Sequence, residues 1–150
     1  MVFDVAAALD LATKAHDGQQ DKEGQPYIGH PMRVMNRLST EYERMTALLH
    51  DVLEDTEVTE SDLRDAGCPQ EVINAVLALT KRPGEDLATS MARAAADDLA
   101  FVVKLADIAD NSDPQRLQRL SHAESCRLTR KYIESRRLLL GARGRAEAQA

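Results

Sequence analysis

The segment from Leu48 to Asp55 carries a histidine and three carboxylates, His50, Asp51, Glu54 and Asp55. Neighbouring residues of a helix point about 100° apart, and residues four apart lie one above the other. We therefore expect all four polar groups on one side of a helix whose other residues are apolar. Three clustered carboxylates repel one another and lose hydration unless a cation or a proton offsets their charge. A divalent transition ion would do so, because imidazole and carboxylate are both suitable ligands.

A less specialised arrangement would give the same pattern. His50 and Asp51 could form a partly buried pair, with Glu54 and Asp55 simply beginning a solvated loop. A His-Asp doublet is common by chance, so the surrounding segments decide how much weight it carries.

A second histidine, His30, stands directly before Pro31 in the stretch Tyr27-Ile28-Gly29-His30-Pro31. Proline suits the first position of a helix, so this loop and the helix after it would fix the direction of the imidazole. The alternative is an ordinary capping or surface histidine.

A third set of polar residues, Lys104, Asp107 and Asn111, is spaced so that all three share one face of a helix. A carboxylate there could hold a cation while the lysine and the amide hold phosphate oxygens. A solvated face with a Lys–Asp pair is the alternative. The three residues adjoin the apolar seam of the helix rather than opposing it, which favours a functional role.

The elements that must position these residues are helical. Apolar residues recur at helical spacing almost throughout, and no sustained alternation of strand type and no internal repeat is present. The sequence predicts an all-α single domain of about seven or more helices. The expected helices begin near Val2, begin at Pro31, surround 45–53, run from Thr59 to Gly67, begin at Pro69, run over about 86–97, surround 99–106, and surround 128–139.

Composition narrows the classes of function. With 150 residues, 43% of them hydrophobic, one domain can bury a sizeable core. Nineteen Lys and Arg against 25 Asp and Glu leave a net charge of −6, which argues against a broad nucleic-acid-binding face. No apolar run approaches a membrane span, no signal peptide is visible, and Cys68 and Cys126 form no metal or redox motif. We expect a cytoplasmic protein with neither nucleic acid nor membrane as partner.

Four segments in the same order resemble the HD-domain phosphohydrolases, and more narrowly the hydrolase domain of Rel/SpoT proteins and the small alarmone hydrolases. The resemblance runs from about Val5 to Asn111. The segments are AHDGQ at 15–19, PYIGHP at 26–31, ALLHDVLEDT at 47–56 and VKLAD at 103–107.

The resemblance implies an all-α enzyme that uses one divalent metal ion, Mn²⁺, to remove the 3′-pyrophosphate of guanosine tetra- and pentaphosphate. We assign residues 1–140 to the hydrolase domain, and we expect 141–150 to form a flexible tail because this segment holds two Gly among small and charged side chains. The implied activators of water are Glu54 and Asp55, and the implied substrate contacts are Lys22 and Asn111. The implied metal ligands are His30, His50, Asp51 and Asp107.

Elementary chemistry agrees with this assignment. Two imidazoles and two carboxylates leave positions open on a six-coordinate ion, and metal binding lowers the pKa of a water from about 15.7 toward roughly 7. Glu54 and Asp55, one turn beyond the doublet, could take the proton of that water. Lys104, Lys22 and Arg82 could balance charge at the phosphorus.

Departures from the family concern the nucleotide. Asp21 stands where an arginine usually faces the base, and Ser112-Asp113-Pro114 replaces the usual Met-Arg-Thr. An acidic side chain accepts hydrogen bonds but does not stack as a planar cation. The reaction class is therefore better supported than the guanine substrate. An adenine alarmone, the 2′-phosphate of NADPH or a nucleoside phosphate stays open, as does a non-catalytic nucleotide sensor.

The remaining polar features are expected to be structural. His16 lies on the apolar face of the first helix and His122 near a helix start. A basic cluster is expected to be a solvated face, with docking of an acidic partner or a homodimer as the alternative. Its members are Arg127, Arg130, Lys131, Arg136 and Arg137.

Overall fold

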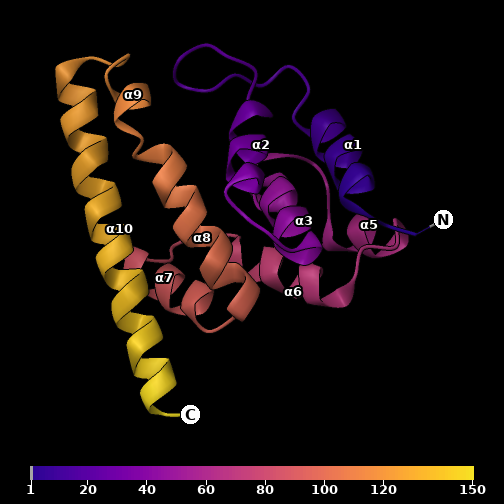
Figure 1. The fold of residues 1–150 in the computed structure, drawn as a ribbon. Helices are drawn as coiled ribbons and strands as arrows, with labels where there is room; N and C mark the ends of the chain where they lie inside the picture. Colours follow the sequence, from indigo (N-terminus) through magenta and orange to yellow (C-terminus); the bar gives the residue numbers. More distant parts are fainter. Residues whose placement is uncertain (1) are drawn as a thin grey trace.

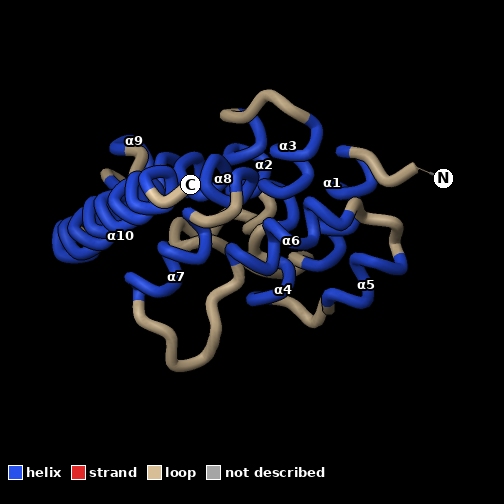
Figure 2. Tube along the Cα trace, turned by 90° about the horizontal axis from the view of Figure 1, so that it is seen from below, coloured by secondary structure: helices blue, strands red, loops and turns tan. Residues whose placement is uncertain are grey.

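The computed structural model describes residues 2–150, which form helices and connecting loops with no strand (Figures 1 and 2). The predicted all-α class is confirmed. The helices are α1 (Val5–Ala15), α2 (Gly29–Asn36), α3 (Glu41–Leu49), α4 (Val52–Asp55), α5 (Glu60–Asp65), α6 (Gln70–Leu79), α7 (Leu87–Ala95), α8 (Asp98–Asn111), α9 (Pro114–Leu117) and α10 (His122–Ala148).

The helix ends carry their own stop and start signals. Thr40 and Glu43 form a reciprocal capping box at the start of α3, which satisfies backbone N–H groups that a helix leaves unpaired. Thr59, the predicted N-cap, forms the same arrangement before α5. Gly67 follows α5 with a φ of +89°, a conformation that glycine adopts without steric cost.

Helix α8 is central to the packing. On one side, Val103 and Ala106 pack with residues of α2 and α3. On another, Ile108 packs with α7 and α10. A separate apolar cluster joins α1, α3, α5 and α6. Figure 1 shows the result: α1 to α3 lie on one side of α8, and α10 runs along the other. Polar residues of α2, α3 and α8 can therefore meet in the middle.

The helix predicted around 45–53 does not run through the His-Asp doublet. Helix α3 ends at Leu49 with His50 as its C-cap, and Asp51 is the N-cap of the short α4. The Nδ1 atom of His50 lies 2.5 Å from the carbonyl oxygen of Ala47, so the ring folds back over the last turn. The doublet thus lies at a bend between two helices rather than on one continuous helical face.

Two other boundaries differ from expectation. Helix α2 begins at Gly29, so Pro31 is its third residue rather than its first. At the other end, α10 continues to Ala148, although 141–150 was expected to fray. Ala142 is buried and the Arg143 guanidinium donates to the carbonyl oxygen of Ala95, which hold this end against α7. Within residues 2–150 no helix is long and apolar enough to cross a membrane.

Candidate metal centre and its cavity

Three buried side chains from separate helices converge beside α8. His30 comes from α2, His50 from the end of α3 and Asp107 from α8, and one ligand atom of each lies within 4.8 Å of the others. His30 Nε2 lies 2.9 Å from Asp107 Oδ1, and His50 Nε2 lies 3.5 Å from the same oxygen. Two imidazole nitrogens and a carboxylate oxygen at this spacing form a donor set suited to a transition metal ion.

An orphaned atom supports the fit to a cation. Among the residues that the structure describes, the buried His50 Nε2 atom has no hydrogen-bond partner, although the Asp51 Oδ2 atom is only 3.0 Å away. Its other nitrogen, Nδ1, is held by the Ala47 carbonyl, so Nε2 is the one aimed at the group. A buried polar atom without a partner costs free energy, and a bound ion would remove that cost.

Asp51 lies at the edge of this group. Besides its approach to His50, its carboxylate accepts a hydrogen bond from the Tyr27 hydroxyl. Burial and the Asp51 charge both raise the pKa of Tyr27, so the phenol stays protonated and acts as a donor. Burial raises the pKa of Asp51, but His50 outweighs this effect and lowers it below its usual value.

The predicted face of α8 is present as an array around Asp107. Lys104 Nζ lies 2.8 Å from Asp107 Oδ2, and Asn111 donates from Nδ2 to Oδ1 at 3.0 Å. Burial raises the pKa of Asp107, but the Lys104 charge and the two imidazoles lower it well below its usual value. The carboxylate is therefore ionised and oriented from two sides.

Protons on the imidazoles of His30 and His50 offset the charge of the nearby carboxylates, as a metal ion would. Burial lowers the pKa of His30 and of His50, but the carboxylates of Asp51, Asp107 and Asp110 outweigh burial and raise both values. A metal ion binds only the neutral imidazole, so it would compete with these protons. The clustered carboxylates thus favour any positive charge in the group, whether protons on the imidazoles or a metal ion.

The acidic pair of α4 lies beside the group. Glu54 accepts a hydrogen bond from the backbone N–H of Lys81 at 2.7 Å, which ties α4 to the loop after α6. Asp55 is exposed at the edge of the group, and partial desolvation together with the Asp51 and Glu54 charges raises its pKa. A carboxylate with a raised pKa is a better proton acceptor than an ordinary one.

All these residues open into one cavity of about 530 Å³. Beyond the acidic residues, its wall carries lysines and an apolar surface. Among the predicted substrate contacts, Lys22, Lys104 and Asn111 lie on it, whereas Arg82, next to the lining residue Lys81, is exposed and is not part of the described lining. The apolar part comprises Leu79, Leu87, Met91, Ile108, Leu117, Leu120, Leu128 and the ring of Tyr132.

Lys131 is exposed, as predicted for its basic cluster, but it also lies at the edge of the cavity. It lines this cavity together with Lys81, and neither lysine forms an ion pair within the described residues. Burial lowers the pKa of Lys131, and the charges of Lys22, Lys104, Arg127 and Lys81 lower it further. The periodicity of α10 could not reveal its place at the cavity, because Lys22, Lys81 and Lys104 come from three other parts of the chain.

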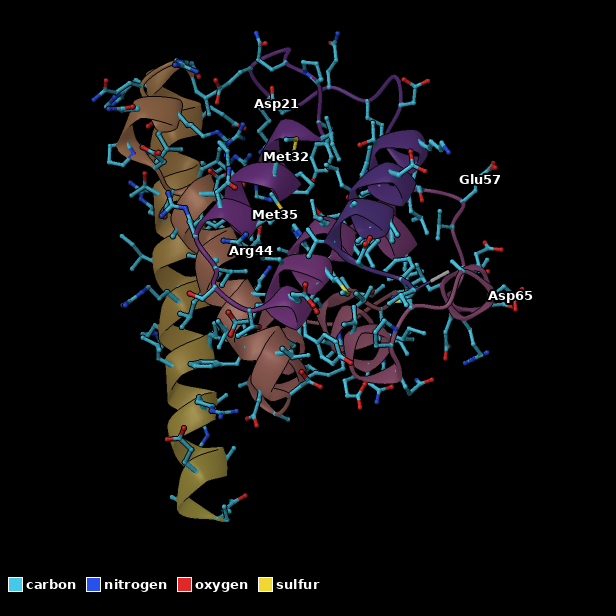
Figure 3. The ribbon with its side chains drawn as sticks, turned by 45° about the vertical axis from the view of Figure 1, so that its right-hand side comes forward. Asp21, Met32, Met35, Arg44, Glu57 and Asp65 are labelled. Atoms are coloured by element: carbon cyan, nitrogen blue, oxygen red, sulfur yellow. The ribbon has the colours of Figure 1, made fainter. Side chains whose placement is uncertain are left out.

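Asp21 is not a free acceptor for a base. Its Oδ1 atom accepts from the backbone N–H groups of Glu23 and Gln25, both at 2.9 Å, and its side chain is 7% exposed. Figure 3 shows Asp21 in the loop above α2. The Asp21 carboxylate stabilises the conformation of this loop, and Lys22 is the residue of the loop that brings positive charge to the cavity.

Other contributors were missed from the sequence. Asp110, one turn after Asp107, accepts from His30 Nδ1 at 2.7 Å. Its spacing from Asp107 could have suggested this. Tyr27 could have been suspected from its place in the segment that carries His30. His16 is buried, as expected, and its ring packs against Tyr27 at 4.9 Å between centroids.

The comparisons with known proteins point in one direction. No family model matches the chain. A probable guanosine-3′,5′-bis(diphosphate) 3′-pyrophosphohydrolase of Mycoplasma pneumoniae is 33% identical over 128 residues, which cover 71% of this chain and 17% of that protein. A guanosine-3′,5′-bis(diphosphate) 3′-pyrophosphohydrolase of Haemophilus influenzae is 40% identical over 77 residues, 47% of this chain and 11% of its own. The chain thus spans less than a fifth of either relative.

The fold has a solved counterpart. The structure of a metazoan ortholog of SpoT, described as hydrolysing ppGpp, superposes with a TM-score of 0.70 over 97% of this chain and 94% of that one. At 24% identity this likeness establishes the shared fold.

Proposed function

The chain belongs to the HD-domain hydrolases of the Rel/SpoT type, and on that premise we propose that it removes the 3′-pyrophosphate of guanosine tetra- or pentaphosphate. The products would be GDP or GTP and pyrophosphate. The observation that carries the proposal is the meeting of His30, His50 and Asp107 in a cavity that also holds an acidic pair and several lysines.

In the proposed site, His30, His50, Asp51 and Asp107 hold one divalent ion. When bound, such an ion supplies Lewis acidity and brings the pKa of a water toward neutrality. Asp55, with its raised pKa, accepts the proton of the attacking water, and Glu54 orients it. Lys104 and Asn111, already fixed on Asp107, face the phosphate.

The rest of the cavity suits a nucleotide. Lys22, Lys81 and Lys131 offer positive charge to the phosphates that are not cleaved, and Tyr132 with the leucines offers a surface for a base. This anionic ligand must approach a protein of net charge −6, so the local cations have to dominate the field at the mouth.

Another nucleotide with the same chemistry is the second candidate. Asp21 supports it, because this loop presents no arginine to a base and the carboxylate itself is used in folding the loop. A nucleotide panel that includes adenine alarmones and NADPH separates the two candidates. Tight binding without turnover of any member would instead indicate a sensor.

Several finer features complete the proposal. We propose Mn²⁺ as the ion, a cytoplasmic setting in which the nucleotide is found, a hydrolase domain over residues 1–140, and a homodimer as the protein partner. Gel filtration with light scattering tests the dimer, and comparison of Mn²⁺ with Mg²⁺, Zn²⁺ and Co²⁺ tests the metal.

The deciding experiment measures pyrophosphate release from guanosine tetraphosphate with Mn²⁺. We expect turnover that chelation abolishes and that His50→Ala reduces to the level of the chelated protein. His122→Ala is the matched control, because His122 is exposed at the start of α10 and should leave the rate unchanged. Full activity after complete removal of divalent ions would refute the mechanism.

A further inference from the structure

A buried carboxylate that the proposed reaction does not use lies behind the metal group. Asp110 of α8 is 1% exposed, and it accepts from His30 Nδ1 at 2.7 Å, from Arg33 Nε at 3.0 Å and from Arg116 Nη1 at 2.8 Å. A buried charge is tolerated when it is paired and hydrogen-bonded, and the two guanidinium groups meet that requirement. Asp110 is thus a fixed charge rather than a solvated one.

The bond to His30 determines how that imidazole faces the centre. When Nδ1 donates its proton to Asp110, the lone pair lies on Nε2, which is the atom 2.9 Å from Asp107. A carboxylate behind a ligating histidine fixes the tautomer, orients the ring and raises the basicity of the ligating nitrogen. His50 has no such partner, since a backbone carbonyl occupies its Nδ1.

Arg116 extends the network to the loop beside the cavity. Its Nε atom donates to Glu23 Oε1 at 3.0 Å, and its Nη2 atom lies 3.9 Å from Asp21 Oδ2. The same guanidinium donates to the Asp110 side chain and, at 3.1 Å, to its backbone carbonyl. One side chain from α9 therefore joins the carboxylate behind His30 to the loop that carries Lys22.

We propose that Asp110 is a positioning residue for His30, and that Arg116 couples this metal ligand to the conformation of the 20–26 loop. The first part rests on the metal role assigned to His30 in the proposed function. The structural basis is a continuous run of hydrogen bonds from His30 through Asp110 and Arg116 to Glu23. A substitution in this network that alters the 20–26 loop should then also alter the affinity of the metal group for its ion.

Calorimetric titration of Mn²⁺ into the metal-free full chain tests the positioning. We expect Asp110→Ala to bind the ion about 10–100-fold more weakly, in line with losses of carboxylates behind metal-bound histidines. Asp110→Asn, which keeps an acceptor for His30 Nδ1, should lose less. Thermal unfolding of each metal-free variant shows whether it folds. If Asp110→Ala does not fold, the Mn²⁺ affinity of Asp110→Asn still tests the positioning role.

Hydrogen exchange of the 20–26 backbone, with and without Mn²⁺, tests the coupling. In the wild type the ion should slow exchange in this loop, and Arg116→Met should weaken Mn²⁺ binding and abolish that slowing. Arg116→Lys, which keeps the charge, should restore part of both. Arg119→Met is the matched control, because Arg119 pairs with the same Glu23 at 2.8 Å and does not contact Asp110.

Each result has a definite meaning. Wild-type affinity in folded Asp110→Ala or Asp110→Asn protein overturns the positioning role, and an Arg119→Met effect equal to that of Arg116→Met overturns the coupling. Failure of the wild type to bind any divalent ion overturns this inference together with the proposed metal centre. Ion binding without hydrolysis of any nucleotide overturns the proposed function alone.

Discussion

The charge of Asp107 is balanced from several directions at once. Lys104 and Asn111 contact its carboxylate, and His30 and His50 approach the same oxygen. The Asp107 carboxylate is therefore fully hydrogen-bonded. A metal ion that binds here has to displace the protons of the His30 and His50 imidazoles. Metal affinity should accordingly rise with pH as the imidazoles lose their protons.

The acidic pair of α4 can be separated from the metal group by substitution. Asp55→Asn removes the proposed proton acceptor without changing the shape of the side chain, so we expect kcat to fall by about 10²–10⁴-fold. Mn²⁺ affinity should stay near the wild-type value, since Asp55 is not one of the convergent ligand atoms. Rapid-quench kinetics and calorimetric titration measure the two quantities.

Glu57→Gln is the control for that comparison. Glu57 is exposed, carries the same charge two residues later and points away from the body of the protein (Figure 3). Equal losses of kcat in Asp55→Asn and Glu57→Gln would show that overall charge, rather than the position of the carboxylate, sets the rate.

Residue types and spacing marked His30, His50 and Asp107 as candidates, and the resemblance to a known family joined them into one ligand set. The structure brings these three side chains together. Asp110 was missed because its partners come from α2 and α9, and the place of Lys131 at the cavity was missed because the other lysines there lie on other segments. Pairing between such segments depends on how helices pack, which helical periodicity does not encode.

Bends and loops between helices bring the groups into reach. The helical period predicted the helices but not the bend at His50, since apolar spacing continues unbroken from Met45 to Leu53. At this bend the His50 ring contacts the Ala47 carbonyl of the last turn of α3, and the Asp51 carboxylate accepts from the Tyr27 hydroxyl, which lies outside the helix. Polar contacts of this kind override a local pattern.

The loop between α6 and α7 is held by one ion pair. Arg93 of α7 pairs with Glu85 and donates to the carbonyl oxygens of Thr80 and Ala78, at 2.8 and 3.2 Å. Hydrogen bonds from Arg93 lower the pKa of Glu85 from 4.5 to about 2. This loop carries Lys81, so its order matters for the cavity.

A pH series tests that pair. Because the pKa of Glu85 is lower in the folded chain, its contribution to stability is complete above about pH 4.5 and is lost as pH falls toward 2. Glu85→Gln should therefore be less stable than the wild type at neutral pH, and the difference should disappear at about pH 2. Urea unfolding at each pH measures it, and a difference independent of pH would contradict the assignment.

The end of α10 offers a second test of packing. Arg143 bonds to the Asp98 side chain at 2.6 Å, and its guanidinium lies 4.9 Å from the centre of the Phe101 ring. Arg143→Met should lower the midpoint of thermal unfolding, whereas Arg145→Met, two residues along on an exposed part of the helix, should not. Identical midpoints for both variants and the wild type would restore the expectation of a loose tail after residue 140.

The protein as a whole repels the substrate that its cavity is proposed to attract. Its net charge is −6, yet Lys22, Lys81, Lys104 and Lys131 meet around a single opening. Attraction of an anion then depends on the local field, which salt screens over about 10 Å at 0.1 M and about 3 Å at 1 M. The rate of productive encounter should respond to ionic strength accordingly.

We therefore expect kcat/KM for guanosine tetraphosphate to fall severalfold as salt is raised from about 0.05 to 0.5 M, with a smaller change in kcat. Changing both Lys81 and Lys131 to Met should lower kcat/KM at low salt and flatten its salt dependence. Lys14→Met removes the same kind of charge far from the cavity, where Lys14 pairs with Asp10 on α1, and should leave the slope unchanged. Equal slopes for all three proteins would mean that the lysines hold bound substrate rather than attract it, because a contact made only after docking acts on dissociation and not on encounter.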